Sequence, residues 1–279
     1  MSRRERGRSS GRGSLSDGLS GSVIGLILMA IVVGILTTVF IYYNKNNVET
    51  DKEGCPLDTS LMKQKWVVMI DTTSPFIDNQ QQALKNLAKQ LTAVAPKFSR
   101  INVYQLTDNV LSNQDKLATV CSPGDPADVD EWVENQKVAQ INFQDNFKKK
   151  IDEVIHSVSG SKGASASPIM ESLQAIALIE FGDIAGNGKN KLILVSDLIQ
   201  FSSSSNLNLY NSLPDYDKLK KNGSLNRLYA PLKGVEVNAM ILQNNPGLQN
   251  DNFLNFWKNY FKDSNAGVST CIFAANCSL

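Results

Sequence analysis

The sequence predicts an α/β domain with a doubly wound, mostly parallel sheet, preceded by one N-terminal transmembrane helix. Three observations support this prediction. One long apolar run stands near the start of the chain, and beyond it short apolar runs alternate with stretches of helical period. Two of the short runs end abruptly at an aspartate, as buried parallel strands do where the chain leaves the sheet. The net charge of +1 and the 42% of hydrophobic residues are ordinary for a globular protein.

The apolar run Val23–Tyr43 contains no charged residue and no proline. As a helix it would span roughly 30 Å, the hydrocarbon thickness of a bilayer. A buried helix of a soluble protein is the alternative, but such a helix rarely stays apolar on every side over its whole length. We therefore expect a membrane-spanning helix, in which Ala30 and Gly34 form a small-residue pair that would allow association with another such helix.

Charges on either side of this run predict its orientation. Arginines dominate before it, while acidic residues outnumber lysines just after it: Arg3, Arg4, Arg6, Arg8 and Arg12 against Lys45, Glu49, Asp51, Lys52 and Glu53. The positive-inside rule then predicts a single-pass protein of the inner (cytoplasmic) membrane, with its N-terminus in the cytoplasm and its C-terminal domain periplasmic or extracellular. The run is too long for a cleaved signal peptide and no small-x-small site follows it, so we expect a signal anchor. The Gly/Ser/Arg-rich segment Met1–Ser22 is predicted to be a disordered cytoplasmic tail.

The cysteines agree with this topology. All of them lie beyond the apolar run: Cys55, Cys121, Cys271 and Cys277. An even count in an oxidising compartment predicts two disulfide bonds, with three possible pairings. Zinc binding through sulfur is not expected, because no C-x-x-C occurs and His156 is the only histidine.

The remaining elements follow in order. Asn44–Met62 is polar and contains Pro56, which indicates a linker, and residues 63–279 form the domain. In the first half we expect three strands: Trp66–Ile70, Ile101–Leu106 and Lys116–Cys121. The last two strands should pair across a turn. We also expect a helix at Gln80–Ala95 and a further helix that ends near Val158. In the second half we expect a flexible loop at Ser159–Ser167, a helix that starts at Pro168 and a turn at Gly182–Gly188. Three strands and one more helix should follow: Leu192–Val195, Val235–Leu242 and Val268–Phe273 as strands, and Asn252–Lys262 as the helix.

Two lysine-rich stretches, Lys148–Lys150 and Lys218–Lys221, are expected to be solvated helix faces. The domain is not basic overall, so no nucleic-acid partner is predicted.

Small oxygen-bearing residues follow the expected strands. In an open α/β sheet, ligands bind at the carboxyl ends of the strands. Three segments place such residues there: Asp71–Pro75, Ser165–Pro168 and Ser196–Asp197. Two carboxylates with hydroxyls and water suit Mg²⁺, Mn²⁺ or Ca²⁺. Alternatively, the two aspartates only accept hydrogen bonds from neighbouring loop amides.

These segments resemble the von Willebrand factor A family and its metal-ion-dependent adhesion site. VVMIDTTS is similar to the first motif, SASPIMESLQAI to the start of the motif helix, and KLILVSDLIQ to the strand before the distant aspartate. The likeness covers most of Lys65–Phe273. It implies a metal site formed by Asp71, Thr73, Ser167 and Asp197, with Ser74 and Ser165 as auxiliary residues.

The sequence departs from the family pattern at two positions. Pro75 stands where the family has a second motif serine, and Ser167 replaces a threonine. Water can take the place of one hydroxyl ligand.

The resemblance implies a membrane-tethered protein-binding module in which Mg²⁺, or else Mn²⁺ or Ca²⁺, completes its coordination with a carboxylate of an unknown protein partner. A metal-free scaffold in an envelope complex is the first alternative, and a metal-assisted phosphohydrolase using Asp71 and Asp197 is the second. Catalysis is not expected, because no P-loop or G-x-G-x-x-G occurs and His156, the only histidine, has no G-x-S-x-G partner within residues 63–279. Moreover, Thr73 stands where an aspartyl-nucleophile phosphatase would need a second aspartate.

Overall fold

A computed structural model describes residues 21–46, 48–62, 64–128, 135–182, 190–272, 277 and 279. The chain divides into two units, Met1–Val48 and Glu49–Leu279, which are described separately. The expected disordered tail falls outside the described residues except for its last two positions. The expected turn at Gly182–Gly188 lies outside them from residue 183 onward.

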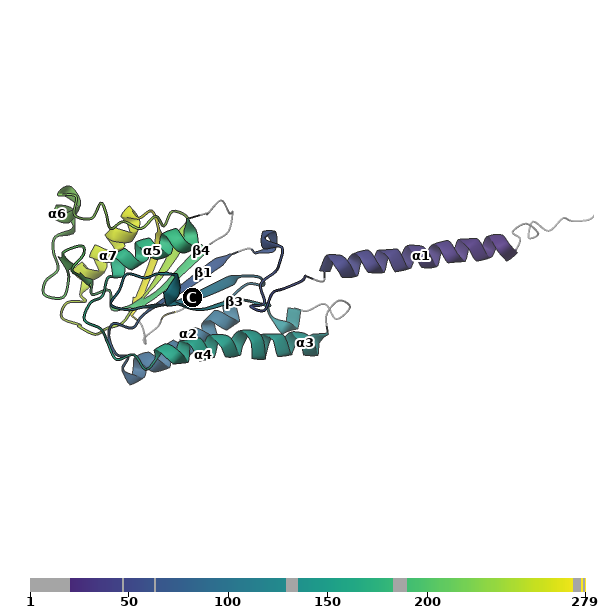
Figure 1. The fold of residues 1–279 in the computed structure, drawn as a ribbon, viewed down its shortest axis with the longest axis horizontal. Coiled ribbons are helices and arrows are strands. Elements are labelled where there is room, and N and C mark those ends of the chain that lie inside the picture. Colours follow the sequence, from purple (N-terminus) through teal and green to yellow (C-terminus); the bar gives the residue numbers. More distant parts are fainter. Residues whose placement is uncertain are drawn as a thin grey trace, which may run out of the picture. The chain divides into compact units, whose positions relative to one another are not determined.

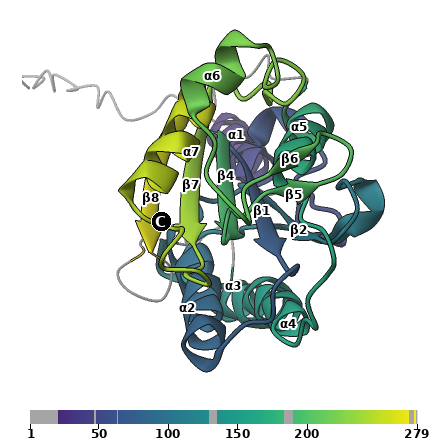
Figure 2. The ribbon, with the colours of Figure 1, turned by 90° about the vertical axis from the view of Figure 1, so that its left-hand side faces the viewer.

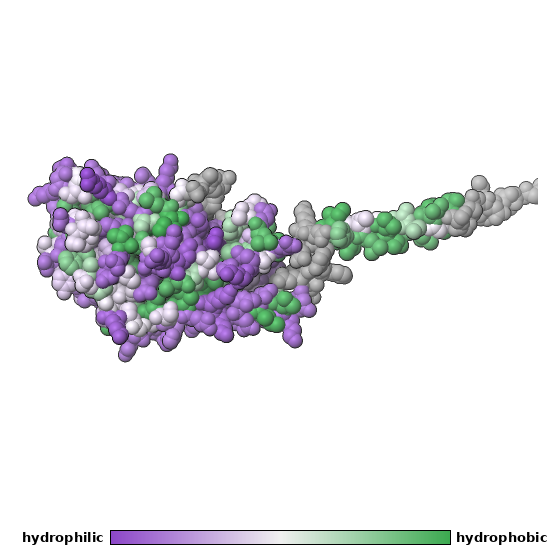
Figure 3. Space-filling model, viewed as in Figure 1, coloured by the Kyte–Doolittle hydropathy of each residue, from purple (hydrophilic) through white to green (hydrophobic). Residues whose placement is uncertain are grey.

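The first unit contains one helix, α1 (Gly21–Asn46). Its segment Val23–Tyr42 has a mean hydropathy of 2.8 and buries none of its surface in the protein, and Figure 3 shows it as a mainly hydrophobic rod. The Thr38 hydroxyl donates a 2.7 Å hydrogen bond to the Gly34 carbonyl, so this polar group is satisfied within the helix. The expected apolar helix is present, and its length and composition suit either a membrane anchor or a signal sequence.

The second unit is built on a six-stranded sheet in the order β3-β2-β1-β4-β7-β8. The strands are β1 (Lys65–Asp71), β2 (Arg100–Leu106), β3 (Lys116–Cys121), β4 (Asn190–Ser196), β7 (Val235–Ile241) and β8 (Gly267–Ile272). Only β3 runs antiparallel to its neighbour, through the expected pairing with β2. The other neighbouring strands are parallel. The predicted fold class is therefore confirmed.

Helices cover both faces of the sheet, as Figures 1 and 2 show. One face carries α2 (Asp78–Val94) and α4 (Lys149–Val158), and the other carries α5 (Ile169–Phe181) and α7 (Asp251–Asp263). Successive strand side chains point to opposite faces, so Val68 and Ile70 join the first helical layer while Val67 and Met69 join the second. Because both layers are apolar, the central strands are continuous hydrophobic runs.

Several short elements differ from the expectations. The helix expected to end near Val158 consists of α3 (Gln136–Ile141), a π-helical stretch η4 (Asn142–Lys148) and α4. Between β4 and β7 the chain forms a hairpin and a short helix: β5 (Phe201–Ser202), β6 (Leu207–Asn208) and α6 (Tyr216–Lys221). The hairpin strands are too short to show a period in the sequence. Single 3-10 turns complete the described elements: η1 (Thr59–Leu61), η2 (Asn113–Asp115) and η3 (Pro126–Asp128).

The expected disulfides form between Cys55 and Cys121 and between Cys271 and Cys277. The first bond connects Cys55, in the segment Asn44–Met62 that was expected to be a linker, to Cys121 at the end of β3. From Glu49 onward this segment belongs to the globular unit. Its turn is closed by the Asp51 carboxylate, which accepts the Cys55 N–H at 2.8 Å. The linker is therefore largely folded onto the sheet, because Cys55 ties it to the edge strand β3.

Candidate functional site

The predicted site residues meet at the carboxyl edge of the sheet. Asp71 is the last residue of β1 and Asp197 directly follows β4. These strands are parallel neighbours, with Ile70 opposite Val195, so their ends emerge side by side. Ser167 lies just before α5 and pairs its backbone with Phe201. The structure thus brings the three predicted segments together, and all three side chains are buried.

Asp71 organises the hydroxyls around it. Its Oδ1 accepts the Thr73 N–H at 3.0 Å and the Thr73 hydroxyl at 2.6 Å, and its Oδ2 accepts the Ser196 hydroxyl at 2.5 Å. Thr73 Oγ1 also lies 3.1 Å from Ser167 Oγ. Burial raises the pKa of the Asp71 carboxyl, and these hydrogen bonds oppose the rise.

Asp197 is held from three directions. Its Oδ1 accepts the Ile199 N–H at 2.9 Å, and its Oδ2 accepts the Asn244 amide at 3.1 Å and the Ser74 hydroxyl at 3.2 Å. Burial, followed by the charge of Asp71, raises the pKa of Asp197 to about 6. The two carboxyls therefore interact electrostatically in a poorly solvated place.

The backbone directly after Asp197 is in an unfavourable conformation. Leu198 has a φ of 59°, in the left-handed region that non-glycine residues seldom occupy. Its carbonyl accepts a 3.0 Å hydrogen bond from the Trp257 indole, while the Asp197 carbonyl accepts a 2.8 Å bond from the Gln249 amide. Non-glycine residues with such unfavourable backbone conformations are concentrated at functional sites, which supports the carboxyl edge of the sheet as the candidate site.

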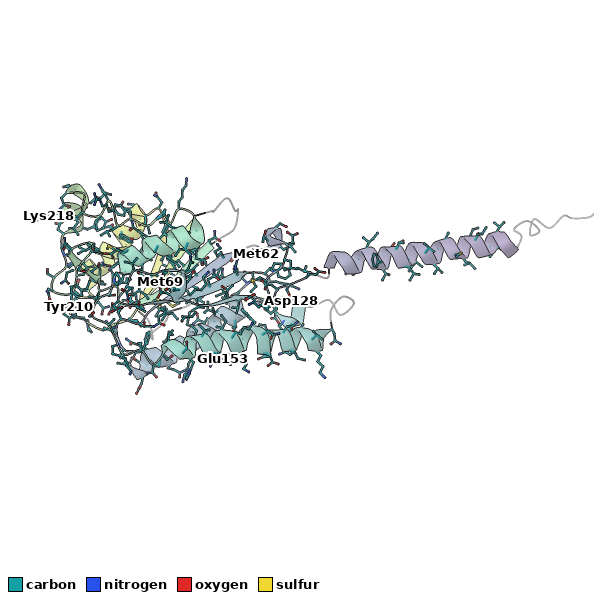
Figure 4. The ribbon with its side chains drawn as sticks, viewed as in Figure 1. Met62, Met69, Asp128, Glu153, Tyr210 and Lys218 are labelled. Atoms are coloured by element: carbon teal, nitrogen blue, oxygen red, sulfur yellow. A yellow bond between two sulfur atoms is a disulfide. The ribbon has the colours of Figure 1, made fainter. Side chains whose placement is uncertain are left out.

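A cleft of about 450 Å³ opens at this edge. It is lined by Thr73, Ser74, Ala164, Ser165, Ala166, Ser167, Asp197, Ile199, Phe201, Tyr210, Asn244 and Asn245. The auxiliary residues Ser74 and Ser165 therefore reach the cleft, whereas Asp71 lies behind its wall. No lysine, arginine or histidine is among these lining residues. Figure 4 labels Tyr210 at the surface of the globular unit, in contrast to Met69 in the interior.

The oxygen atoms of the cleft fit a hard cation. Thr73 Oγ1 and Ser167 Oγ lie 3.1 Å apart, and Ser74 Oγ and Asp197 Oδ2 lie 3.2 Å apart. Neighbouring ligands around Mg²⁺ at 2.0–2.1 Å are separated by about 2.9 Å, which is close to the separation within each of these two pairs. Within the described ranges, neither aspartate forms an ion pair with lysine or arginine.

Few of the oxygen atoms that could bind a cation in the cleft belong to charged side chains. No group of three His, Cys, Asp or Glu side chains that would hold a metal occurs among the described residues. Pro75 supplies no hydroxyl, and Ser74 faces Asp197 in its stead. Hydroxyls and water would therefore have to supply most of the ligands.

Sequence reasoning missed several residues of the site. Asn244 lies just beyond β7, which pairs with β4, so the rule about strand ends could have found it. Ser196 is the last residue of β4, one position before the predicted Asp197. Nothing in the sequence indicated that Phe201 and Tyr210 belong to the site, because the segment around the β5–β6 hairpin has no recognisable strand periodicity.

No protein-family model matches the chain, and no curated protein matches it. Among solved structures, the chain is similar to the von Willebrand factor type A protein from Catenulispora acidiphila, with a TM-score of 0.43 and 13% identity over 76% of this chain and 39% of that one. It is also similar to the pilus adhesin SpaC from Lactobacillus rhamnosus GG, with a TM-score of 0.40 and 9% identity over 77% of this chain and 29% of the other. The matches span less than two fifths of these proteins, and at such identities the likeness concerns the general course of the chain and not its function.

Proposed function

We propose that this chain is a membrane-tethered protein-binding module whose contact site is the cleft at the carboxyl edge of the sheet. The observation that carries the proposal is the placement of Asp197 with hydroxyl and amide groups in an open cleft of about 450 Å³. Ligand sites in α/β proteins occupy this edge and commonly have volumes of roughly 300–1,000 Å³. The helix α1 supports the tethering, because it is long and apolar enough to anchor the chain.

In the finer version of the proposal, the cleft works with a divalent cation, Mg²⁺ or else Mn²⁺ or Ca²⁺. Thr73, Ser167 and Asp197 would hold the ion, and Ser74 and Ser165 would assist. Asp71, which the resemblance implied as a fourth ligand, does not line the cleft and would instead orient the hydroxyls. The ion would neutralise two buried carboxyls and offer an open position to a carboxylate oxygen of the partner. The raised pKa of Asp197 supports this version, since burial, followed by the charge of Asp71, makes its ionised form unfavourable and a bound cation would offset both effects.

Cation binding can be tested on the full chain in nanodiscs. Mg²⁺ should raise the melting temperature of the wild type by several degrees, because a ligand that binds only the folded state stabilises it. Asp71→Ala and Asp197→Ala should lose this response, whereas Asp108→Ala, which removes an exposed carboxylate, should keep it. Equal responses in all four proteins would contradict the cation-dependent version.

A metal-free scaffold remains the second candidate, because one observation favours it. Asp197 already accepts three internal hydrogen bonds, so its carboxylate is satisfied without an ion. In this case, partner capture by the tethered chain would be the same with and without chelator.

The hypothesis of a metal-assisted phosphohydrolase has less support. Asp71 is only 2% exposed and both of its oxygens accept hydrogen bonds, so it is badly placed to attack a phosphoester. Turnover of p-nitrophenyl phosphate that requires Asp71 and a divalent ion would overturn this conclusion.

A further inference from the structure

Two aromatic side chains at the cleft are exposed. Phe201 is 42% and Tyr210 is 64% exposed, although both line the same cleft as Asp197. The larger aromatic residues elsewhere in the globular unit are mostly buried, including Trp66, Tyr104, Phe147, Phe253, Trp257, Tyr260 and Phe261. Exposed aromatics beside a polar cleft are typical of binding surfaces, because such side chains dominate the energy of protein interfaces.

The backbone that carries these aromatics is tied to the floor of the cleft. Phe201 N–H donates to the Ser167 carbonyl at 3.0 Å, and Ser167 N–H donates to the Phe201 carbonyl at 2.8 Å. On its other side, Phe201 pairs with Asn208 in the hairpin. The Asn208 side chain then accepts the Tyr210 N–H at 2.8 Å. The backbone that carries the two rings is therefore connected to Ser167 through hydrogen bonds.

Glu171, on the first turn of α5, anchors the same hairpin. Its carboxylate accepts the Gln200 amide at 2.8 Å and the Ser204 hydroxyl at 3.1 Å. The Gln200 side chain in turn accepts the Met170 N–H at 2.9 Å. These bonds join the hairpin to helix α5, so the loop loses little conformational entropy when a ligand binds.

Charge is distributed unevenly within the cleft. The floor, the buried part of the lining, carries the Asp197 carboxylate with Asp71 behind it, while the rim, the exposed part of the lining, is uncharged and includes Ala164, Phe201 and Tyr210. An occupant complementary to both parts needs a group that engages the floor and a large uncharged side chain that lies against the rim. Two neighbouring residues of one partner segment can meet both conditions, one at the floor of the cleft and the other at its rim.

We infer that the cleft recognises a partner segment in which an acidic residue lies beside a large apolar or aromatic residue, and that Phe201 and Tyr210 set the preference for the second residue. The acidic residue would reach the cation at the floor, so this inference rests on the proposed function. The second side chain would pack on the two rings and be removed from water.

Selection from a phage-displayed library of random dodecapeptides tests this inference. The bait is the full chain in nanodiscs with Mg²⁺. The wild type should enrich peptides with an acidic residue next to Phe, Trp, Tyr, Leu, Ile or Met. A Phe201→Ser/Tyr210→Ser variant should still enrich acidic peptides but lose the apolar preference. Leu178→Ser is the matched control, because Leu178 is 66% exposed on α5 and does not line the cleft.

A synthetic copy of the most enriched wild-type peptide makes the test quantitative. The double rim variant should bind it at least about tenfold more weakly, because the apolar side chain of the peptide loses both of the rings on which it packs, while the Mg²⁺ response of the variant stays unchanged. Leu178→Ser should bind the peptide like the wild type.

The outcomes separate the two levels of the proposal. Enrichment of acidic peptides without an apolar neighbour would overturn the rim inference and leave the proposed function standing. Mg²⁺-independent enrichment of basic peptides, or no enrichment dependent on Asp197, would contradict the cation-dependent function itself.

Discussion

The hydroxyl of Ser74, which follows β1, donates a 3.2 Å hydrogen bond to the carboxylate of Asp197, which follows β4. This bond joins two strand ends and forms part of the floor of the cleft. The parallel pairing of the same strands places Asp71 near Asp197, and the repulsion from the Asp71 charge adds to the effect of burial on the Asp197 pKa. Charge at this edge therefore opposes folding unless something cationic balances it.

The first prediction concerns stability and pH. The pKa of Asp197 is raised from an ordinary 3.8 to about 6 in the folded protein, so the folded state binds the proton more tightly. Stability from this group is therefore present below about pH 4 and is lost as the pH rises to about 6. Relative to the wild type in chelator, Asp197→Asn should gain on the order of 2–3 kcal/mol across this window, because it cannot ionise.

Urea unfolding of the full chain in detergent, followed by tryptophan fluorescence between about pH 4 and pH 7, measures this difference. Asp108→Asn is the control, since Asp108 is exposed and should show no such gain. A difference between Asp197→Asn and the wild type that does not change with pH would contradict the interpretation.

The second prediction concerns Glu180, a buried acid at the far end of α5. Its carboxylate accepts the Tyr104 hydroxyl at 2.5 Å and the Asn102 amide at 2.8 Å, and it forms a 2.8 Å ion pair with Lys116. Glu180→Gln leaves Lys116 without its counter-charge, so it should lower the free energy of unfolding by about 3 kcal/mol near neutral pH. Burial opposes ionisation of Glu180, but these partners hold its pKa below the usual value, so the cost should shrink as the pH falls through that pKa.

A matched control for Glu180 lies on α4. Asp152 forms a 3.0 Å ion pair with Lys148, and both side chains are about two-fifths exposed, at 43% and 38%. Asp152→Asn should cost less than about 0.5 kcal/mol in the same urea titration. Similar losses in both variants would show that the Glu180 network adds nothing beyond an ordinary surface pair.

The third prediction concerns the disulfides. Peptide mapping without reduction should recover Cys55 linked to Cys121 and Cys271 linked to Cys277. The first bond spans 66 residues and the second 6, so chain entropy predicts losses of about 4 and about 2 kcal/mol when each pair is replaced by alanine. Any other pairing in the map, or a larger loss from the short loop, would contradict this assignment.

The fourth prediction concerns topology. We expect the N-terminus in the cytoplasm and the globular unit on the far side of the membrane. A membrane-impermeant maleimide applied to spheroplasts should label Ser203→Cys, an exposed position of the β5–β6 hairpin, whereas Ser9→Cys should react only after lysis. The opposite labelling pattern would reverse the orientation, and release of the unit as a soluble protein would indicate a cleaved signal instead of an anchor.

The elements of this fold were largely predictable because their signals are local. Trp66–Ile70 is continuously apolar since both faces of its strand are buried, and the α2 sequence repeats its apolar residues at helical spacing. The edge pairing of β2 with β3 was also predictable, because no helix long enough for a parallel crossover lies between them. The hairpin Phe201–Asn208 was not, because two-residue strands carry no period.

The candidate site was predictable only in part. Asp71 and Asp197 stood out because each follows a buried strand, and parallel strands end at the same edge. Asn244 obeys the same rule, but it lies three residues beyond the end of β7, and the last residues of that strand are unremarkable in sequence. Tyr210 reaches the cleft only because the hairpin folds back on Ser167.

The sequence by itself determined the apolar span of α1, the asymmetry of charge around it, the alternation of strands and helices, and the even number of cysteines. These features depend on composition and on spacing over a few residues. Tertiary structure alone decided which cysteines pair, which donors hold Asp197, how far its pKa rises and which aromatics stand beside it. Most of these depend on distances between segments far apart in the chain, such as Cys55 and Cys121 or Ser74 and Asp197, and only packing of the whole sheet sets those distances.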